Sequence, residues 1–318
     1  MTNAWIAEGA VVRAVALDEA LSCAREGAGA VWIDLDRDDE AAARAVLEPL
    51  AVHPLVVEDV VTHVNRPKVD NYGAYLYLVV HSARWDEDRP RLREIDVVVG
   101  ERFIVTCHEG PTRSIDAARE VLPRRAELLA SGPAPLLHFM LDTLADHYLP
   151  IVDRIAEEID GLEEQVFEEG DDRAVHQRVV RLKRGMAALR RVLGPQRDTV
   201  LALTRDEFRP VPAAMRPYLR DVYDRLARVN DLLDSFRDET ATLLELHVSV
   251  VSNRLNEIIK RLTVIATVGL PLTVVTGYYG MNFALPEYRW PHAEWYALGL
   301  LVLTAGATWW YLKRRRWS

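Results

Sequence analysis

Two long apolar runs in the last sixth of the chain are separated by a short polar stretch. The first covers 25 residues without a charge between Arg261 and Glu287, and the second covers 18 uncharged residues after Glu294. Because about 20 apolar residues are needed to cross a bilayer, we predict transmembrane helices over about 262–281 and 295–312. A pair of buried core helices would need a core that no other segment supplies.

The distribution of basic residues predicts the orientation of these two spans. Lys260 and Arg261 precede the first span and a basic cluster, 313–316, follows the second, whereas the loop over 282–294 has only Arg289. By the positive-inside rule both flanking segments lie in the cytoplasm and the loop lies on the outer face of the plasma (inner) membrane. The aromatic residues around the basic cluster are typical of anchors among membrane lipids.

The N-terminal part of the chain has the pattern of an α/β domain, which we place over 1–130. It mixes helical patterns over 17–27 and 39–50 with short β-rich runs. These runs cover 9–17, 30–36, 74–85, 95–100 and 102–108. The first ten residues lack both a basic and a sustained apolar segment, so no signal peptide is expected and the domain should stay in the cytoplasm.

Long helical patterns follow the β-rich runs and define a predicted long-helix domain over 131–261. A helix over 138–170 runs to an acidic turn, and a basic, leucine-rich helix over 175–193 is predicted to return antiparallel to it. No Gly or Pro occurs in the 51 residues between Pro217 and Gly269. This segment is predicted to form one helix that continues into the first span.

Composition and charge narrow the classes of partner. Hydrophobic residues make up 49% and charged residues 27% of the chain, which is compatible with a globular core. Residues 260–318 carry a net charge of +5, so the total of −9 leaves −14 on the rest. An acidic body argues against nucleic acid and favours cations as partners. Cys23 and Cys107 stand alone, which indicates neither a disulfide framework nor a thiolate metal site.

One face of the longest predicted helix is rich in small and polar residues. At alternating spacings of three and four it holds Ser249, Ser252, Asn256, Ile259, Thr263, Ala266, Leu270, Thr273, Gly277 and Gly280. Tight packing between membrane helices explains such a stripe. Alternatively, several copies face one another around an axis and the stripe lines a path. Two spans per chain are too few to enclose a path, so this interpretation requires an oligomer.

The chemistry of the stripe restricts what can pass along it. Amide and hydroxyl oxygens such as those of Asn256, Thr273 and Asn282 suit a hydrated ion, and Mg²⁺ keeps its waters. Zn²⁺ prefers His and Cys, which neither span contains. The chain has no P-loop signature, and inward movement of a divalent ion gains about 4.6 kcal/mol per 100 mV. The membrane potential is therefore a sufficient source of energy.

A four-residue motif, YGMN (279–282), stands where the first span reaches the outer face. Three further segments carry the same resemblance: HPLVVEDV (53–60), RPKVDNY (66–72) and PYLRDVYD (217–224). On these segments, the chain resembles the CorA family of magnesium and divalent-cation transporters over essentially its whole length. The resemblance implies an α+β membrane protein with a cytoplasmic α/β domain, a long-helix funnel and a transmembrane domain over 262–318. It also implies a homopentamer that takes up Mg²⁺ or Co²⁺ and uses no organic cofactor.

The resemblance assigns roles to individual residues. Gly280, Met281 and Asn282 are expected to form the outer selectivity filter, with the Asn282 oxygens binding the hydrated cation. Leu262 and Leu270 match hydrophobic constrictions of the pore. The complete set of matched pore positions is Asn256, Leu262, Leu270 and Thr273.

The resemblance also implies a regulatory Mg²⁺ site in the cytosol, between subunits. Asp221 matches one ligand, and its partner is Asp86 or, because the alignment is loose there, Asp88. Bound Mg²⁺ would hold the funnel closed. The chain departs from the family at Ala284, where many members carry a carboxylate, so Glu287 is expected to provide the acidic ring at the outer mouth.

Two alternative functions stay open. The related ZntB branch transports Zn²⁺ and usually reads GVN, so Met281 favours Mg²⁺ or Co²⁺. A membrane-tethered metal sensor or hydrolase is the other alternative. The nine histidines form no HExxH motif, and 34–45 resembles an EF-hand loop but lacks its Gly and Glu. An enzyme is therefore not expected.

Overall fold

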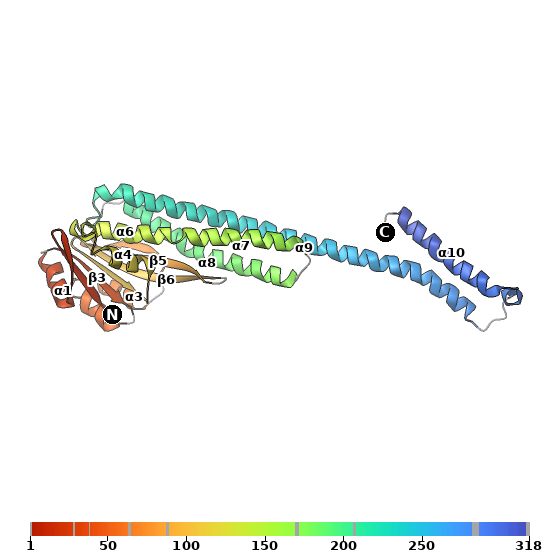
Figure 1. Ribbon diagram of the computed structural model, residues 1–318. Helices are drawn as coiled ribbons and strands as arrows, with labels where there is room; N and C mark the ends of the chain where they lie inside the picture. Colours follow the sequence, from red (N-terminus) through yellow and green to blue (C-terminus); the bar gives the residue numbers. More distant parts are fainter. Residues whose placement is uncertain are drawn as a thin grey trace. The chain divides into compact units, whose positions relative to one another are not determined.

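The computed structural model describes residues 2–27, 29–37, 39–62, 65–86, 89–168, 172–205, 208–281 and 286–315. The chain divides into two compact units, Met1–Leu243 and Leu244–Ser318. The helix α9, Arg216–Tyr279, begins in the first unit and ends in the second (Figure 1). The predicted boundaries at 130 and 261 stay predictions, because the sheet and the helices up to residue 243 pack within one unit.

The first unit contains a seven-stranded sheet with the order β2-β1-β3-β7-β6-β5-β4. β3 and β7 run parallel, and the other neighbouring pairs in the described chain are antiparallel. The strands are β1 Asn3–Glu8, β2 Val11–Val15, β3 Ala30–Asp36, β4 Lys68–Asn71, β5 Tyr75–Asp86, β6 Arg89–Gly100 and β7 Phe103–His108. The five predicted β-rich runs are confirmed as β2, β3, β5, β6 and β7, whereas β1 and β4 were not predicted.

Three helices cover one face of this sheet, and other helices cover the opposite face. α1 Leu17–Glu26, α2 Glu40–Leu47 and α3 Pro54–Thr62 bury their apolar sides in a core with alternate residues of the strands, such as Ile33 and Val79. On the other side, the sheet contacts α5 Glu127–Ala130, α6 Pro133–Asp146 and α8 Asp172–Arg205, with α4 Arg113–Val121 packed on α6. The sheet is therefore covered on both faces, which explains why β3 is buried over nearly its whole length although it contains two aspartates.

The helix predicted over 138–170 is two helices, α6 and α7 Leu149–Phe167. The break falls just before Pro150, which lies in the first turn of α7, where the missing N–H of proline is tolerated. The returning basic helix is confirmed as α8, which is longer than predicted because it continues through Gly194 and Pro195. Gly185 lets α8 approach the sheet, since a Cβ there would lie 2.7 Å from the Trp85 ring.

In the second unit, α9 continues through Gly269 and Pro271 to Tyr279, followed by a short 3-10 turn, Pro286–Arg289, and α10, Ala293–Arg314. Within the described residues, the helix that ends at Tyr279 is the one long and apolar enough to cross a membrane. α10 has 22 residues, which at about 1.5 Å per residue match a bilayer core of about 30 Å. The second predicted span, 295–312, falls within α10 and stays a prediction.

Candidate ion pathway and regulatory site

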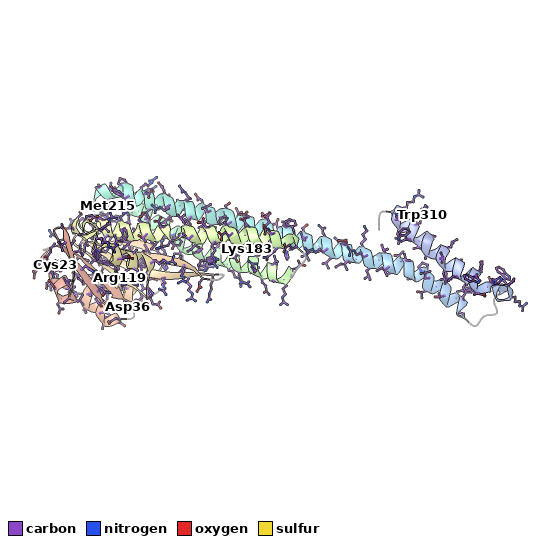
Figure 2. The ribbon with its side chains drawn as sticks, viewed as in Figure 1. Cys23, Asp36, Arg119, Lys183, Met215 and Trp310 are labelled. Atoms are coloured by element: carbon purple, nitrogen blue, oxygen red, sulfur yellow. The ribbon has the colours of Figure 1, made fainter. Side chains whose placement is uncertain are left out.

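The sequence-predicted pore residues all lie on α9, Asn256 before the predicted span and the others within it, and all are exposed in the single chain. Leu262 and Leu270 are 65% and 68% exposed, and their neighbours Ile265 and Val274 are similar (69% and 62%). Figure 2 shows side chains projecting from α9 and from α10, where Trp310 is labelled. So much exposed apolar surface is not stable in water, so this part of α9 requires cover from lipid or from other helices.

The continuous helix places the four matched pore residues on one side of α9. On a helix of 3.6 residues per turn, Asn256, Leu270, Thr273 and Leu262 fall, in that order, within an arc of about 120°. Such an arc is the width of a typical contact face of a helix. These residues can therefore face a common axis when several copies of the chain assemble, and their role in a pore stays a prediction.

The hydroxyl groups along this part of α9 are positioned as acceptors. Thr263 donates to the carbonyl of Ile259 (2.7 Å), Thr273 to that of Gly269 (3.0 Å), and Thr276 to that of Leu272 (3.0 Å). Each hydroxyl hydrogen is thereby used within the helix, and the oxygen keeps lone pairs that point elsewhere. The water molecules around a hydrated cation present hydrogens outward, so acceptor oxygens are the groups that suit them.

Two of the three predicted filter residues lie at the C-terminal end of α9. The backbone amide of Gly280 donates to the carbonyl of Thr276 (2.9 Å), and the amide of Met281 donates to the carbonyl of Tyr278 (3.3 Å). Both residues therefore extend the backbone hydrogen bonding of the helix. A Cβ at Gly280 would lie 3.1 Å from the Thr276 oxygen, which explains a glycine in this crowded position. Met281 is 48% exposed.

The other residues expected at the outer mouth are only partly described. Asn282, the expected cation ligand, and Ala284 lie outside the described residues. Glu287 lies in the 3-10 turn before α10. Its Oε2 atom is buried and has no hydrogen-bond partner among the described residues.

The two predicted regulatory aspartates are each paired with an arginine of the same chain. Asp221, on α9, lies 2.5 Å from Nη2 of Arg225, and its side chain is 69% exposed. Asp86, at the end of β5, lies 2.6 Å from Nε of Arg91 across the hairpin. No contact within the described chain joins Asp86 to Asp221, so a site made by both requires a second copy. Asp88 lies outside the described residues.

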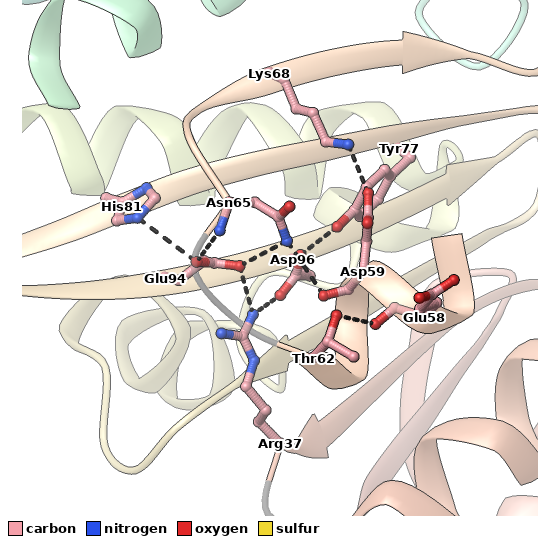
Figure 3. Close-up of polar contacts among 10 residues, drawn as sticks. All are labelled: Arg37, Glu58, Asp59, Thr62, Asn65, Lys68, Tyr77, His81, Glu94 and Asp96. Atoms are coloured by element: carbon pink, nitrogen blue, oxygen red, sulfur yellow. Dashed lines mark hydrogen bonds and ion pairs between the residues drawn. The ribbon is translucent and has the colours of Figure 1, made fainter. Parts of the chain in front are cut away.

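A buried polar network on β5 and β6 was not found from the sequence (Figure 3). The side chains of Arg37, Glu94 and Asp96 are 5%, 8% and 1% exposed. Arg37 pairs with both carboxylates, at 3.1 Å from Glu94, and Tyr77 donates to Asp96 (2.6 Å). The signal in the sequence is a pair of carboxylates, two residues apart, in the middle of β6 where its buried apolar half begins, but this pair does not indicate which cation balances it.

This network continues to the helices on the far side of the sheet through the backbone of His81. The His81 amide donates to Oε1 of Gln196 on α8 (2.6 Å), and the Tyr148 hydroxyl donates to the His81 carbonyl (2.6 Å). Burial lowers the pKa of the His81 imidazole, which is therefore neutral at pH 7. The described residues hold no group of three or more His, Cys, Asp or Glu that is arranged to bind a metal. We assign the network a structural role.

Comparisons with known proteins agree with this architecture. Residues 27–314 match the family described as CorA-like Mg²⁺ transporter protein. The cobalt/magnesium transport protein CorA of Thermotoga maritima is 32% identical over 300 residues, which cover 92% of this chain and 85% of that protein. The zinc transport protein ZntB of Cronobacter sakazakii is 26% identical over 295 residues, covering 90% and 87% of the two chains.

A solved structure has the same fold as this chain. The complete structure of the CorA magnesium transporter from Methanocaldococcus jannaschii superposes with a TM-score of 0.85 at 18% identity and covers 100% of this chain and 99% of that one. The fold expected from the sequence, an N-terminal α/β domain followed by a long helix that leads into a membrane segment, is thereby confirmed. This protein belongs to the family of CorA-like Mg²⁺ transporter proteins, which are membrane ion transporters and not enzymes.

Proposed function

We propose that this protein imports hydrated Mg²⁺, and also Co²⁺, through a pore formed by the α9 helices of a homopentamer in the plasma (inner) membrane. The observation that carries the proposal is the pore-side arc of α9. It presents neutral amide and hydroxyl oxygens, and no charged, imidazole or thiolate group stands at its four matched positions, Asn256, Leu262, Leu270 and Thr273. Such a surface suits a cation that keeps its water shell.

In this proposal, the ion enters from the outer face, where Glu287 attracts it and Asn282 binds its water shell beside Gly280 and Met281. It then passes Thr273 and the two leucine constrictions on its way to the cytoplasm. The spans are 262–281 and 295–312, with both flanking segments cytoplasmic. An inside-negative potential drives the movement, because a divalent ion gains about 4.6 kcal/mol per 100 mV.

Transport of Zn²⁺ is the second candidate, since the Cronobacter sakazakii relative is named for zinc. Uptake into proteoliposomes of the full-length protein, under the same imposed potential and at equal concentrations of Mg²⁺, Co²⁺ and Zn²⁺, separates the two. We expect Mg²⁺ and Co²⁺ uptake to exceed Zn²⁺ uptake at least about tenfold, because neither span offers the His or Cys ligands that Zn²⁺ prefers. Faster uptake of Zn²⁺ than of Mg²⁺ would assign the zinc function instead.

We also propose that cytosolic Mg²⁺ closes the pore by bridging Asp221 of one subunit and Asp86 of the next. Each aspartate is paired with one arginine in the single chain, and a divalent ion would replace that arginine as the stronger counter-charge. The site lies in the first compact unit, in which α9 begins. Movement of these like-charged groups after loss of the ion would open the funnel.

Removal of both aspartates is expected to abolish inhibition by internal Mg²⁺. For Asp221→Ala combined with Asp86→Ala, the half-inhibitory Mg²⁺ concentration, measured by uptake into vesicles loaded with graded Mg²⁺, should rise at least about tenfold, the effect of about 1.4 kcal/mol of lost binding. Asp221→Lys should instead reduce uptake without internal Mg²⁺, because the lysine replaces the bound cation.

Asp224→Ala is the matched control, because Asp224 is also an exposed aspartate of α9 with an arginine four residues away. It should leave the inhibition unchanged. If inhibition by internal Mg²⁺ survives in the double variant, these two residues do not form the regulatory site.

A further inference from the structure

Several arginines lie together on the outward face of the hairpin formed by β5 and β6. Arg84 on β5 is directly opposite Arg91 on β6, and Ser82 is opposite Arg93. Successive residues of a strand point to opposite faces, so these four side chains share one face of the hairpin. Trp85, on the other face, packs against α8 at Gly185.

Arg113, the first residue of α4, lies beside these arginines, and together they line a cleft of about 270 Å³. We call it the arginine cleft and define it by Arg84, Arg91, Arg93 and Arg113. The cleft is also lined by the residues Ser82 and Thr112 and by the two acidic residues Asp86 and Asp116.

The acidic residues do not neutralise the arginine cleft. Asp86 pairs with Arg91 at 2.6 Å, and Asp116 pairs with Arg119, which lies outside the cleft, at 3.2 Å. Arg93 donates to the uncharged carbonyl of Pro111. Three guanidinium groups, those of Arg84, Arg93 and Arg113, therefore have no carboxylate partner among the described residues.

The arginines of the cleft repel one another, and among the described residues Asp86 offsets only the charge of Arg91. Like charges directly opposite each other on antiparallel strands destabilise the pair, and Arg84 and Arg91 occupy such positions. The concentration of positive charge also contrasts with the net charge of −9 on the whole chain. A bound anion would remove the repulsion.

We propose that the arginine cleft binds a phosphate-bearing anion. The planar guanidinium group matches phosphate oxygens with two parallel hydrogen bonds. The cleft is smaller than the roughly 300–1,000 Å³ of pockets for drug-sized ligands, so it fits one or two phosphate groups rather than a whole nucleotide. Free pyrophosphate and the phosphate end of a nucleotide share this chemistry. The cleft lies in the first unit and shares Asp86 with the proposed regulatory site, but the inference does not depend on the ion that is transported.

Calorimetric titration of the full-length protein in detergent, with EDTA present, tests the proposal. EDTA removes divalent ions, so that Asp86 cannot hold phosphate through a metal. The probes are inorganic pyrophosphate and ATP, and both are expected to bind saturably at low salt. Arg84→Gln and Arg113→Gln should each weaken binding at least about tenfold, as expected for the loss of a hydrogen bond to a charged group.

Arg124→Gln is the matched control, because Arg124 is exposed, follows α4 and does not line the cleft. It should leave the affinity unchanged. Equal affinities for pyrophosphate and ATP would assign a bare phosphate group as the ligand, and tighter binding of ATP would assign a nucleotide. The proposal is wrong if neither probe binds at millimolar concentration, or if the two variants alter the oligomeric state without changing pyrophosphate binding.

Discussion

Asn282→Ala is expected to lower Mg²⁺ uptake into proteoliposomes at least about a hundredfold. The substitution removes one amide from every subunit at the proposed filter, and each lost hydrogen bond to the water shell of the ion is worth about 1 kcal/mol. Losses from several subunits around one ion combine, and about 2.7 kcal/mol already corresponds to a hundredfold. The measurement is the initial rate of uptake under a fixed inside-negative potential.

Asn253→Ala is the control for this substitution. Asn253 is an exposed amide on the same helix, and it falls outside the arc that contains the four matched pore residues. The Mg²⁺ uptake rate of Asn253→Ala should stay within a factor of about two of the wild-type rate, as expected for a surface substitution. Equal rates for Asn282→Ala and the wild type would remove Asn282 from the pathway.

The largest expected effect on stability is that of Arg37→Met. Its guanidinium is the charge that balances Glu94 and Asp96 inside the first unit. Removal of one partner from a buried ion pair costs about 3–5 kcal/mol, because the other charge stays buried without compensation. At about 2–4 °C per kcal/mol, the midpoint of thermal unfolding should fall by about 6–20 °C. Tryptophan fluorescence of the full-length protein reports the transition, since Trp32 is fully buried in the same sheet.

Arg44→Met provides the comparison, because Arg44 forms an exposed pair with Glu40, four residues away on α2. Such a pair contributes about 0.3–0.5 kcal/mol, so the midpoint should shift by no more than about 2 °C. Partial recovery is expected when Arg37→Met is combined with Glu94→Gln, since the second change removes one of the uncompensated charges. Similar midpoints for Arg37→Met and Arg44→Met would contradict the role given to the network.

The elements with a strong local pattern were predictable from the sequence. The β-rich runs at 30–36 and 102–108 are rich in apolar and β-branched residues and appear as β3 and β7, which are buried over nearly their whole length because both faces of the sheet are covered. β4, by contrast, is a four-residue edge strand, KVDN, whose charged and amide residues have low β-propensity. It forms because β5 offers a partner, which the local sequence does not indicate.

The candidate sites also differ in how much of each could be predicted from a local sequence pattern. The stripe of small and polar residues on α9 was recognisable because its members repeat with the period of one helix, whereas the role of the four matched positions in a pore follows from the resemblance and stays a prediction. The buried network and the arginine cleft join residues that are far apart in the chain, such as Arg37 with Glu94 and Arg84 with Arg113. Their contacts depend on strand register and on the placement of α4, neither of which has a local signal. The proposed pair of Asp221 and Asp86 depends in addition on a second copy of the chain.

Accumulation of Mg²⁺ in proteoliposomes of the wild-type chain decides whether the membrane potential alone drives Mg²⁺ through this protein, as we propose. Vesicles with no ATP and no other gradient are held at an inside-negative potential of about 60 mV, which is worth about 2.8 kcal/mol for a divalent ion. With the outside Mg²⁺ kept low enough that the accumulated ion does not close the pore, we expect the inside concentration to reach about a hundredfold above the outside, and Mg²⁺ to equilibrate without accumulation when the potential is zero. Accumulation that is equal at both potentials, or no uptake at either, would show that the potential does not drive Mg²⁺ through this protein.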